Sequence, residues 1–278
     1  MKYTIVLQAI TPIAHQDTSN AGNTTNVRLF MRQAMLVNGI ATQVPSISEN
    51  ALRTVLFRET LADGLMQDLG VQRGELPQAV VNLLFSGGNM AAGSKAPSNE
   101  IELGHMVKRN YPNLDLLGGA VDGFILPKSR LKVSAWLVTR EYLPALKYIA
   151  PDLCAEAENI SVYDLVSEET RTRGTGGEAS GNQMLYTYET LAAGAKLVVE
   201  LVLDPHTPEL ALSALGYALE RWQGFIGGQG RQGRGRMAVV SHDLPSSDLY
   251  RQYIADNAGS LKDGLVDGTL GTGKKLCA

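Results

Sequence analysis

The order of its periodic segments constrains the fold of this 278-residue chain more than any other feature. Alternating apolar and polar residues are typical of strands, and an apolar residue every three or four positions is typical of helices. The order is strand, helix, strand, strand, helix, strand, over residues 2–9, 49–69, 130–138, 195–204, 208–222 and 236–241. This order predicts an α+β domain of the ferredoxin-like βαββαβ type. We expect one elaborated domain over residues 1–278, because no linker or internal repeat divides the sequence.

The helix expected within residues 46–70 has the clearest boundary signals. Ser46 and Glu49 have the spacing of a capping box, and Ser48 is an alternative N-cap. Apolar residues fall on one face of this helix. Gly70 is a natural stop, because glycine tolerates the left-handed conformation that often ends a helix.

Four further segments lie outside this core pattern. Residues 28–47 resemble a hairpin, because their Asn-Gly pair suits a type I′ turn. Residues 76–118 predict an insertion of short helices with a loop near Pro112. The polar, glycine-rich residues 169–182 predict a long loop. A short helix near residues 247–256 and a glycine-rich tail follow the last strand.

Composition excludes several classes of protein. The net charge is −3 and the pI is near 5.9, whereas a free, non-specific nucleic-acid binder is usually basic. Cys154 and Cys277 lie far apart without a CxxC spacing, which argues against a disulfide scaffold and a zinc cluster. No apolar run reaches transmembrane length. We therefore predict a soluble, cytoplasmic protein without a membrane partner, a metal or another cofactor.

The stretch GFIGGQGRQGRGRM, residues 224–237, holds six glycines and three arginines. Glycine lets the main chain approach a ligand closely, and arginine binds phosphate through paired donors. The nearest carboxylates in sequence are Glu220 before these arginines and Asp243 after them, so we expect few carboxylate partners. A flexible loop with solvated arginines is the alternative, but the combination of backbone N–H groups and guanidinium groups favours phosphate contact.

Two matches to nucleotide-binding motifs are rejected. Gly228, Gly230 and Gly233 satisfy GxGxxG, but the dinucleotide motif needs strand, glycines and helix in that order, and here a helix precedes and a strand follows. The stretch GTLGTGKK, residues 268–275, resembles a Walker A run without its Ser/Thr and without a preceding strand. We expect it to be a frayed tail.

Cationic residues recur in groups outside the glycine-rich turn. They are Arg28 and Arg32; Arg53 and Arg58; Lys128, Arg130 and Lys132; and Arg171 and Arg173. Like charges that share a strand face indicate a shared anionic partner. Surface ion pairs with Glu49 and Glu59 are the alternative for the two helical arginines. An extended anion that crosses several elements explains the groups better than a small phosphate ligand does.

Catalytic signals are weak. His15, Asp17 and Ser19 lie close together in a polar segment, where a general acid or base is conceivable but a polar loop is the simpler interpretation. The other histidines, His105, His206 and His242, have no metal-ligand spacing.

Two motifs together resemble a known family. Pro45, Ser48, Asn50 and Arg53 match a Pro-x-x-Ser-x-Asn/Ser-x-x-Lys/Arg run that opens the first helix, and residues 227–236 match a glycine-rich segment before the last core strand. Both are similar to the RAMP-superfamily backbone subunits of CRISPR effector complexes, most like the type IV branch. The resemblance covers residues 1–59 and 195–241.

The resemblance implies a modified RNA-recognition-type (RRM-like) palm, with residues 76–118 in a finger insertion and 160–188 as a thumb hairpin. It implies copies stacked head to tail along a guide RNA, with other effector subunits and a target DNA or RNA as further partners. Together with the cation pattern it predicts a set of RNA-binding residues: Arg28, Arg32, Ser48, Asn50, Arg53, Lys128, Arg130, Arg171, Arg173, Gly228, Gly230, Arg231, Arg234 and Arg236.

RNA-cleaving relatives carry an aspartate in the loop before the first helix, and residues 23–33 have none. Asp17 lies earlier, so we predict a subunit that does not cut RNA. A metal-independent endoribonuclease that processes the guide precursor, with His15 in catalysis, is one alternative. A structural assembly protein without a nucleic-acid role is another.

Overall fold

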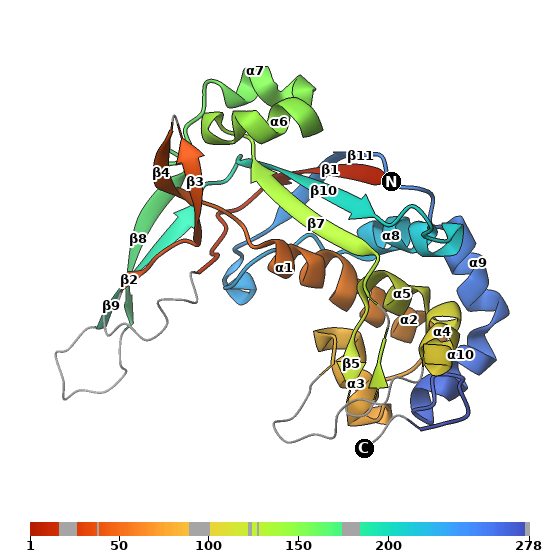
Figure 1. Ribbon diagram of the computed structural model, residues 1–278. Coiled ribbons are helices and arrows are strands. Elements are labelled where there is room, and N and C mark those ends of the chain that lie inside the picture. Colours follow the sequence, from red (N-terminus) through yellow and green to blue (C-terminus); the bar gives the residue numbers. More distant parts are fainter. Residues whose placement is uncertain are drawn as a thin grey trace, which may run out of the picture.

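A four-stranded antiparallel sheet lies at the centre of the fold (Figure 1). The computed structural model describes residues 1–16, 27–37, 39–88, 101–121, 124–126, 128–173 and 184–275. The sheet has the order β11-β1-β10-β7, in which the strands are β1 Lys2–Ala9, β7 Leu131–Leu137, β10 Lys196–Leu203 and β11 Met237–His242. All three neighbouring pairs are antiparallel. The predicted α+β class is confirmed, and so are the positions of these four strands.

Two long helices cover one face of this sheet. The first runs through three consecutive segments between β1 and β7: α1 Glu49–Leu52, the π-helical η2 Arg53–Glu59 and α2 Thr60–Leu69. The second, α8 Glu209–Arg221, connects β10 to β11. Ile5 and Leu7 of β1, Leu56 of the first helix and Leu215 of α8 are fully buried in the core between the layers.

The first helix begins and ends where its sequence predicts. The Ser48 side chain caps it by accepting the Ala51 N–H at 3.3 Å, whereas Ser46 is buried upstream. At the other end Gly70 adopts a left-handed conformation with φ of 62°. Of the two candidate caps, the structure therefore selects Ser48.

A helical layer extends from the lower end of the sheet in Figure 1. It consists of η3 Arg73–Glu75, α3 Gln78–Ser86, α4 Ile101–Asn110, α5 Pro112–Leu117, the short strands β5 Ala120–Val121 and β6 Phe124–Ile125, and the C-terminal helices α9 Asp248–Asp256 and α10 Ala258–Val266. The loop expected near Pro112 is reduced to Tyr111 between α4 and α5, and the proline itself occupies the first turn of α5. The frayed tail is wrong, because Leu270 is fully buried and its carbonyl accepts an N–H from Asn110.

Two β-hairpins stand at the other end of the molecule (Figure 1). The predicted hairpin in residues 28–47 is confirmed as β3 Arg32–Val37 with β4 Ile40–Pro45, although Asn38 of its turn lies outside the described residues. The second pairs β8 Val166–Arg173 with β9 Met184–Leu191, and β2 Val27–Arg28 adds to β9 in parallel. The loop expected from residue 169 is therefore wrong up to residue 173.

A small helical unit links β7 to the second hairpin. It contains η4 Arg140–Tyr142, α6 Leu143–Ile149, η5 Pro151–Leu153 and α7 Cys154–Ala157. The Tyr142 hydroxyl donates to the Pro45 carbonyl at 2.8 Å, which attaches this unit to the end of β4.

Candidate nucleic-acid interface

The glycine-rich turn folds back onto the segment that follows β1. Gly228 donates its N–H to the Ala14 carbonyl at 2.7 Å, and Gly235 donates to the Pro12 carbonyl at 2.9 Å. A Cβ at Gly227 would overlap the Ala14 carbonyl oxygen, and both Gly227 and Gly235 have positive φ. These two glycines are therefore needed for packing within the chain.

Other glycines of this turn remain open to solvent. Gly228 and Gly230 are exposed, and a Cβ added at Gly230 would meet nothing within 4 Å. The short 3-10 turn η6 Gly230–Gln232 carries Arg231 to the surface. Some glycines of the turn thus allow close packing against the chain, and others leave the main chain exposed to solvent.

The three arginines of the turn divide in the same way. Arg231 and Arg236 are exposed, but Arg234 is 4% exposed and donates to the Glu169 carboxylate on β8. The expectation that these arginines lack carboxylate partners beyond Glu220 and Asp243 is therefore wrong for Arg234. Its contact holds the second hairpin against the glycine-rich turn.

His15 ties the same segment to the start of the first helix. Its Nε2 accepts the backbone N–H of Ser48 at 3.0 Å, so the proton of the neutral ring lies on Nδ1. Burial lowers the pKa of His15, because desolvation disfavours the charged imidazolium. The ring also packs edge-on against Phe30. The histidine therefore serves as a neutral hydrogen-bond acceptor that fixes the helix N-terminus.

Arg28 and Arg32 do not share the strand face that the sequence predicts. The chain leaves β2 after Arg28 and begins β3 at Arg32, so the two residues belong to different sheets. Arg28 is exposed and donates to the Gln16 side chain at 3.1 Å. Arg32 donates to Glu189 at 2.8 Å, and the same carboxylate accepts the Phe30 N–H at 2.7 Å.

Three consecutive residues thus join three elements. Ala14 bonds to the glycine-rich turn, His15 to the start of the first helix and Gln16 to Arg28. The elements that they join carry exposed or partly exposed polar groups: Arg28, Ser48 with Asn50, the main chain at Gly228 and Gly230, and Arg231 with Arg236. We call this set the glycine-turn surface.

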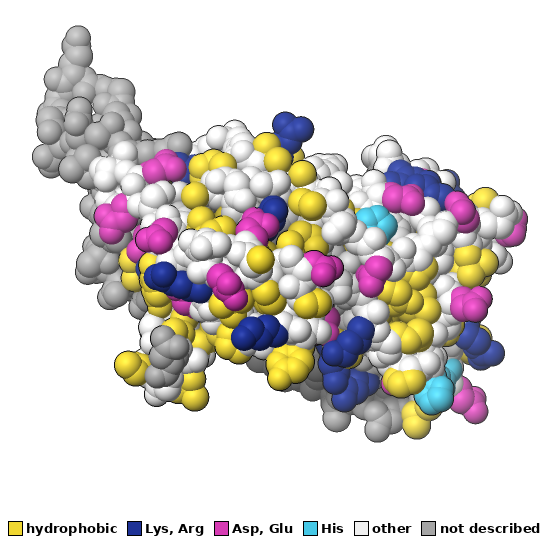
Figure 2. Space-filling view, turned by 90° about the horizontal axis from the view of Figure 1, so that it is seen from above, with side chains coloured by type: hydrophobic (Ala, Val, Ile, Leu, Met, Phe, Trp, Pro, Cys, Tyr) yellow, Lys and Arg dark blue, Asp and Glu magenta, His cyan; other side chains and the backbone are white. Residues whose placement is uncertain are grey.

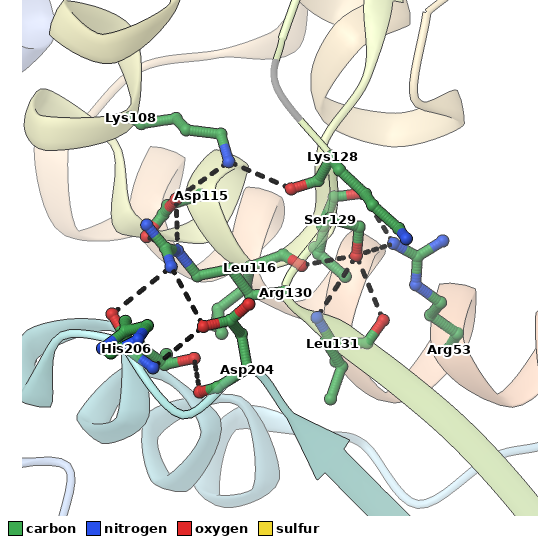
Figure 3. Close-up of polar contacts among 12 residues, drawn as sticks. Arg53, Lys108, Asp115, Leu116, Lys128, Ser129, Arg130, Leu131, Asp204 and His206 are labelled. Carbon is green, nitrogen blue, oxygen red and sulfur yellow. Dashed lines mark hydrogen bonds and ion pairs between the residues drawn. The ribbon is translucent and has the colours of Figure 1, made fainter. Parts of the chain in front are cut away.

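A second cationic group surrounds the start of β7 (Figure 3). Arg53 donates through Nη2 to the Leu117 carbonyl at 2.6 Å and to Ser129 Oγ at 2.7 Å. Arg58 donates to the same Leu117 carbonyl at 3.0 Å and to the carbonyls of Gly118 and Leu83 at 3.1 Å. The two arginines bind carbonyl groups at the end of α5. They therefore do not form the surface ion pairs with Glu49 and Glu59 that were the alternative interpretation.

The π-helical segment explains why both arginines reach one carbonyl. Residues five apart lie on different faces of an α-helix, whose turn takes 3.6 residues, but a π-helix closes i to i+5 and turns them towards one side. The Thr60 hydroxyl donates to the Val55 carbonyl at 2.8 Å, five residues back. Burial and the neighbouring charge of Arg53 lower the pKa of Arg58 to about 10.

Arg130 and Lys128 complete this second group. Arg130 donates through Nε to both Asp115 oxygens, at 2.7 and 2.8 Å, and lies 3.8 Å from Asp204. Lys128 is exposed, and its carbonyl accepts from Lys108 at 3.1 Å. Lys108 and Asp115 were not predicted, because no local sequence signal shows that these two charged side chains are buried as a pair.

The remaining candidates lie outside what the structure describes. Arg171 and Arg173 belong to β8, but their side chains are outside the described residues, as are Asp17, Ser19 and Cys277. In the described part of the chain, no three His, Cys, Asp or Glu side chains gather in a way that would hold a metal ion. None of the described helices is long and apolar enough to span a bilayer.

One face of the molecule carries positive and negative charges side by side (Figure 2). Figure 2 looks down on the molecule from above, and on this face the described Lys and Arg side chains lie among Asp, Glu and apolar groups without a broad basic field. On this face, electrostatic attraction for a polyanion would come only from local groups of cations.

Comparisons with known proteins support the fold. A scan against protein-family models finds no match, and no curated protein matches the sequence. A solved chain described as "Type IV-B CRISPR Complex" matches with a TM-score of 0.56 and 20% identity, over 91% of this chain and 98% of that chain. The chain has the fold of a type IV-B CRISPR complex component. The expected resemblance to the type IV branch is thus confirmed as a likeness of fold.

Proposed function

We propose that the chain is a non-catalytic backbone subunit of a CRISPR effector complex, which polymerises along guide RNA and presents it to target DNA or RNA. The match to a type IV-B CRISPR complex chain over 91% of the sequence supports a place among effector subunits. In this proposal the four-stranded sheet with its two helices is a ferredoxin-like palm, residues 76–118 belong to the fingers, and the β8–β9 hairpin is the thumb.

The junction at residues 14–16 is the observation that carries this proposal. It joins the glycine-rich turn, with the exposed Gly230, Arg231 and Arg236, and the exposed Arg28 to the start of the first helix. A helix N-terminus and guanidinium groups both favour phosphate oxygens. Contacts of this kind fix a strand in place without reading its sequence, which suits a subunit that must accept any guide.

Co-purification with RNA tests the proposal. The chain is expressed with a CRISPR array, purified, and assayed for a discrete small RNA. We expect the double variant Arg231→Glu/Arg236→Glu to lose the RNA while keeping the wild-type unfolding transition. The matched control is Lys147→Glu/Lys262→Glu, which makes the same charge change at exposed positions on α6 and α10. Equal RNA retention in both double variants would contradict the proposal.

The geometry of His15 speaks against the endoribonuclease alternative. A general base needs a free lone pair, and His15 Nε2 already accepts the Ser48 N–H while Nδ1 carries the proton. We expect the purified chain to leave repeat RNA intact. Cleavage that is lost in His15→Ala but kept in Lys262→Ala would establish the enzyme instead.

A further inference from the structure

A cavity of about 770 Å³ lies between α4, α5 and the start of α8, away from the glycine-turn surface. A groove of about 610 Å³ adjoins it, running past β7 and the end of β10. The two share His105, Lys108 and Arg130 in their walls, so they form one continuous depression. Volumes in this range suit a small organic ligand.

Positive charge dominates the groove. Its cationic wall residues are Lys2, Lys108, Lys128, Arg130 and Lys132, against the single carboxylate of Asp204. Asp115 and Asp204 balance Lys108 and Arg130, and Glu200 balances Lys2. Lys128 and Lys132 are exposed and form no ion pair within the described part of the chain. A chain with net charge −3 therefore keeps a local surplus of positive charge at this point.

Lys108 is the most informative residue of the wall. Its side chain is 7% exposed, and its Nζ donates to Asp115 at 3.0 Å and to the Lys128 carbonyl at 3.1 Å (Figure 3). An ammonium group has three N–H donors, and the described residues supply acceptors for two. A buried donor left without an acceptor is costly, so a ligand oxygen in the shared wall would stabilise it.

The cavity itself is mainly apolar. Met106, Pro112, Leu210 and Ala211 line it, and Arg109 and Glu102 stand among them. A ligand that fills both parts therefore needs an anionic end for the groove and a flat or apolar end for the cavity.

We propose that this depression binds a nucleotide, with the phosphate on Lys108 and Arg130 and the base among Met106, Pro112 and Leu210. The Lys128 side chain points away from these two cations in Figure 3 and adds positive charge at the rim of the groove. The choice of a nucleotide over other amphiphilic anions rests on the proposed function. A free mononucleotide and one nucleotide of a longer strand carry the same chemistry, so the experiment has an arm for each.

Fluorescence anisotropy with 2-aminopurine probes tests the site. One arm uses 2-aminopurine riboside 5′-monophosphate, and the other a short single-stranded RNA with one 2-aminopurine. We expect Met106→Glu and, separately, Lys128→Glu to weaken binding by about tenfold or more, because the first removes an apolar contact and the second reverses a charge at the rim of the groove. Met106 is half-buried, and Met106→Glu could unfold the chain. Lys128 is exposed, so Lys128→Glu keeps the fold and still tests the site in that case. Lys262→Glu is the control.

The outcomes separate this site from the glycine-turn surface. Binding of the mononucleotide assigns a free-nucleotide site. Binding of the labelled RNA alone assigns a nucleotide within a strand, provided that Arg231→Glu/Arg236→Glu still binds the RNA and Lys128→Glu weakens this binding. Arg231→Glu/Arg236→Glu should leave mononucleotide binding unchanged. If this variant keeps guide RNA, the proposed function fails but the nucleotide site in the depression does not. Absence of binding by both probes, equal binding by Lys128→Glu, or displacement by a poly-glutamate peptide in preference to nucleotides would overturn the inference.

Discussion

Removal of the Arg58 side-chain donors should destabilise the fold strongly. Arg58 is 7% exposed and donates to the carbonyls of Leu83, Leu117 and Gly118. In Arg58→Met the Leu117 carbonyl keeps its bond from Arg53, so two carbonyls lose this donor. Each orphaned buried acceptor costs about 1–3 kcal/mol, which gives a loss of about 2–6 kcal/mol in the free energy of unfolding.

Denaturant unfolding followed by circular dichroism measures this loss. The matched control is Arg73→Met, which removes an exposed arginine whose guanidinium lies 4.2 Å from the centroid of the Phe85 ring. It should change the free energy of unfolding by about 1 kcal/mol or less. We also expect Arg58→Lys to remain destabilised, because an ammonium group cannot reproduce the planar fork that reaches three carbonyls. The reasoning is refuted if Arg58→Met unfolds at the same denaturant concentration as Arg73→Met.

Three further predictions follow from the packing around the glycine-turn surface. Gly235→Ala should lower the free energy of unfolding by about 1–3 kcal/mol, because φ is 79° and a Cβ would overlap the Ile226 carbonyl, whereas Gly230→Ala should have little effect; thermal melts compare them. The pKa of His15 is lowered in the folded state, so the neutral ring contributes fully to the free energy of unfolding above the unfolded pKa of about 6.5. This contribution falls as the pH drops below that value. In His15→Gln, the free energy of unfolding measured against pH should lack this decrease. A double-mutant cycle of Arg234→Met with Glu169→Gln should give a coupling energy of about 0.5–3 kcal/mol, and additive effects would contradict the contact.

Local sequence signals predicted the core elements well. Ser48 and Gly70 mark the first helix because capping depends on residues close in sequence. The strands of the sheet alternate or are wholly apolar, so their pattern is visible without an alignment. Residues 169–173 were not predicted as a strand because they are polar at every position. They form a strand by pairing with β9, which local sequence does not show.

The roles of individual arginines could not be predicted from local sequence. Arg234 pairs with a glutamate 65 residues away, and Arg58 meets carbonyls 25 to 60 residues away. Arg53 and Arg58 share a target only because the helix widens into a π-turn, for which no sequence signal was used. Local sequence therefore could not distinguish the arginines that stabilise the fold from those that remain exposed.

The salt dependence of RNA binding tests the central claim most directly. The claim is that Arg231 and Arg236 contact phosphates of a guide strand at the glycine-turn surface. For a single strand each phosphate contact contributes about 0.7 to the slope of log K against log salt concentration. Arg231→Ala/Arg236→Ala should therefore reduce the slope for guide RNA by about 1.4 relative to wild type. A slope and an affinity equal to those of wild type would contradict the account.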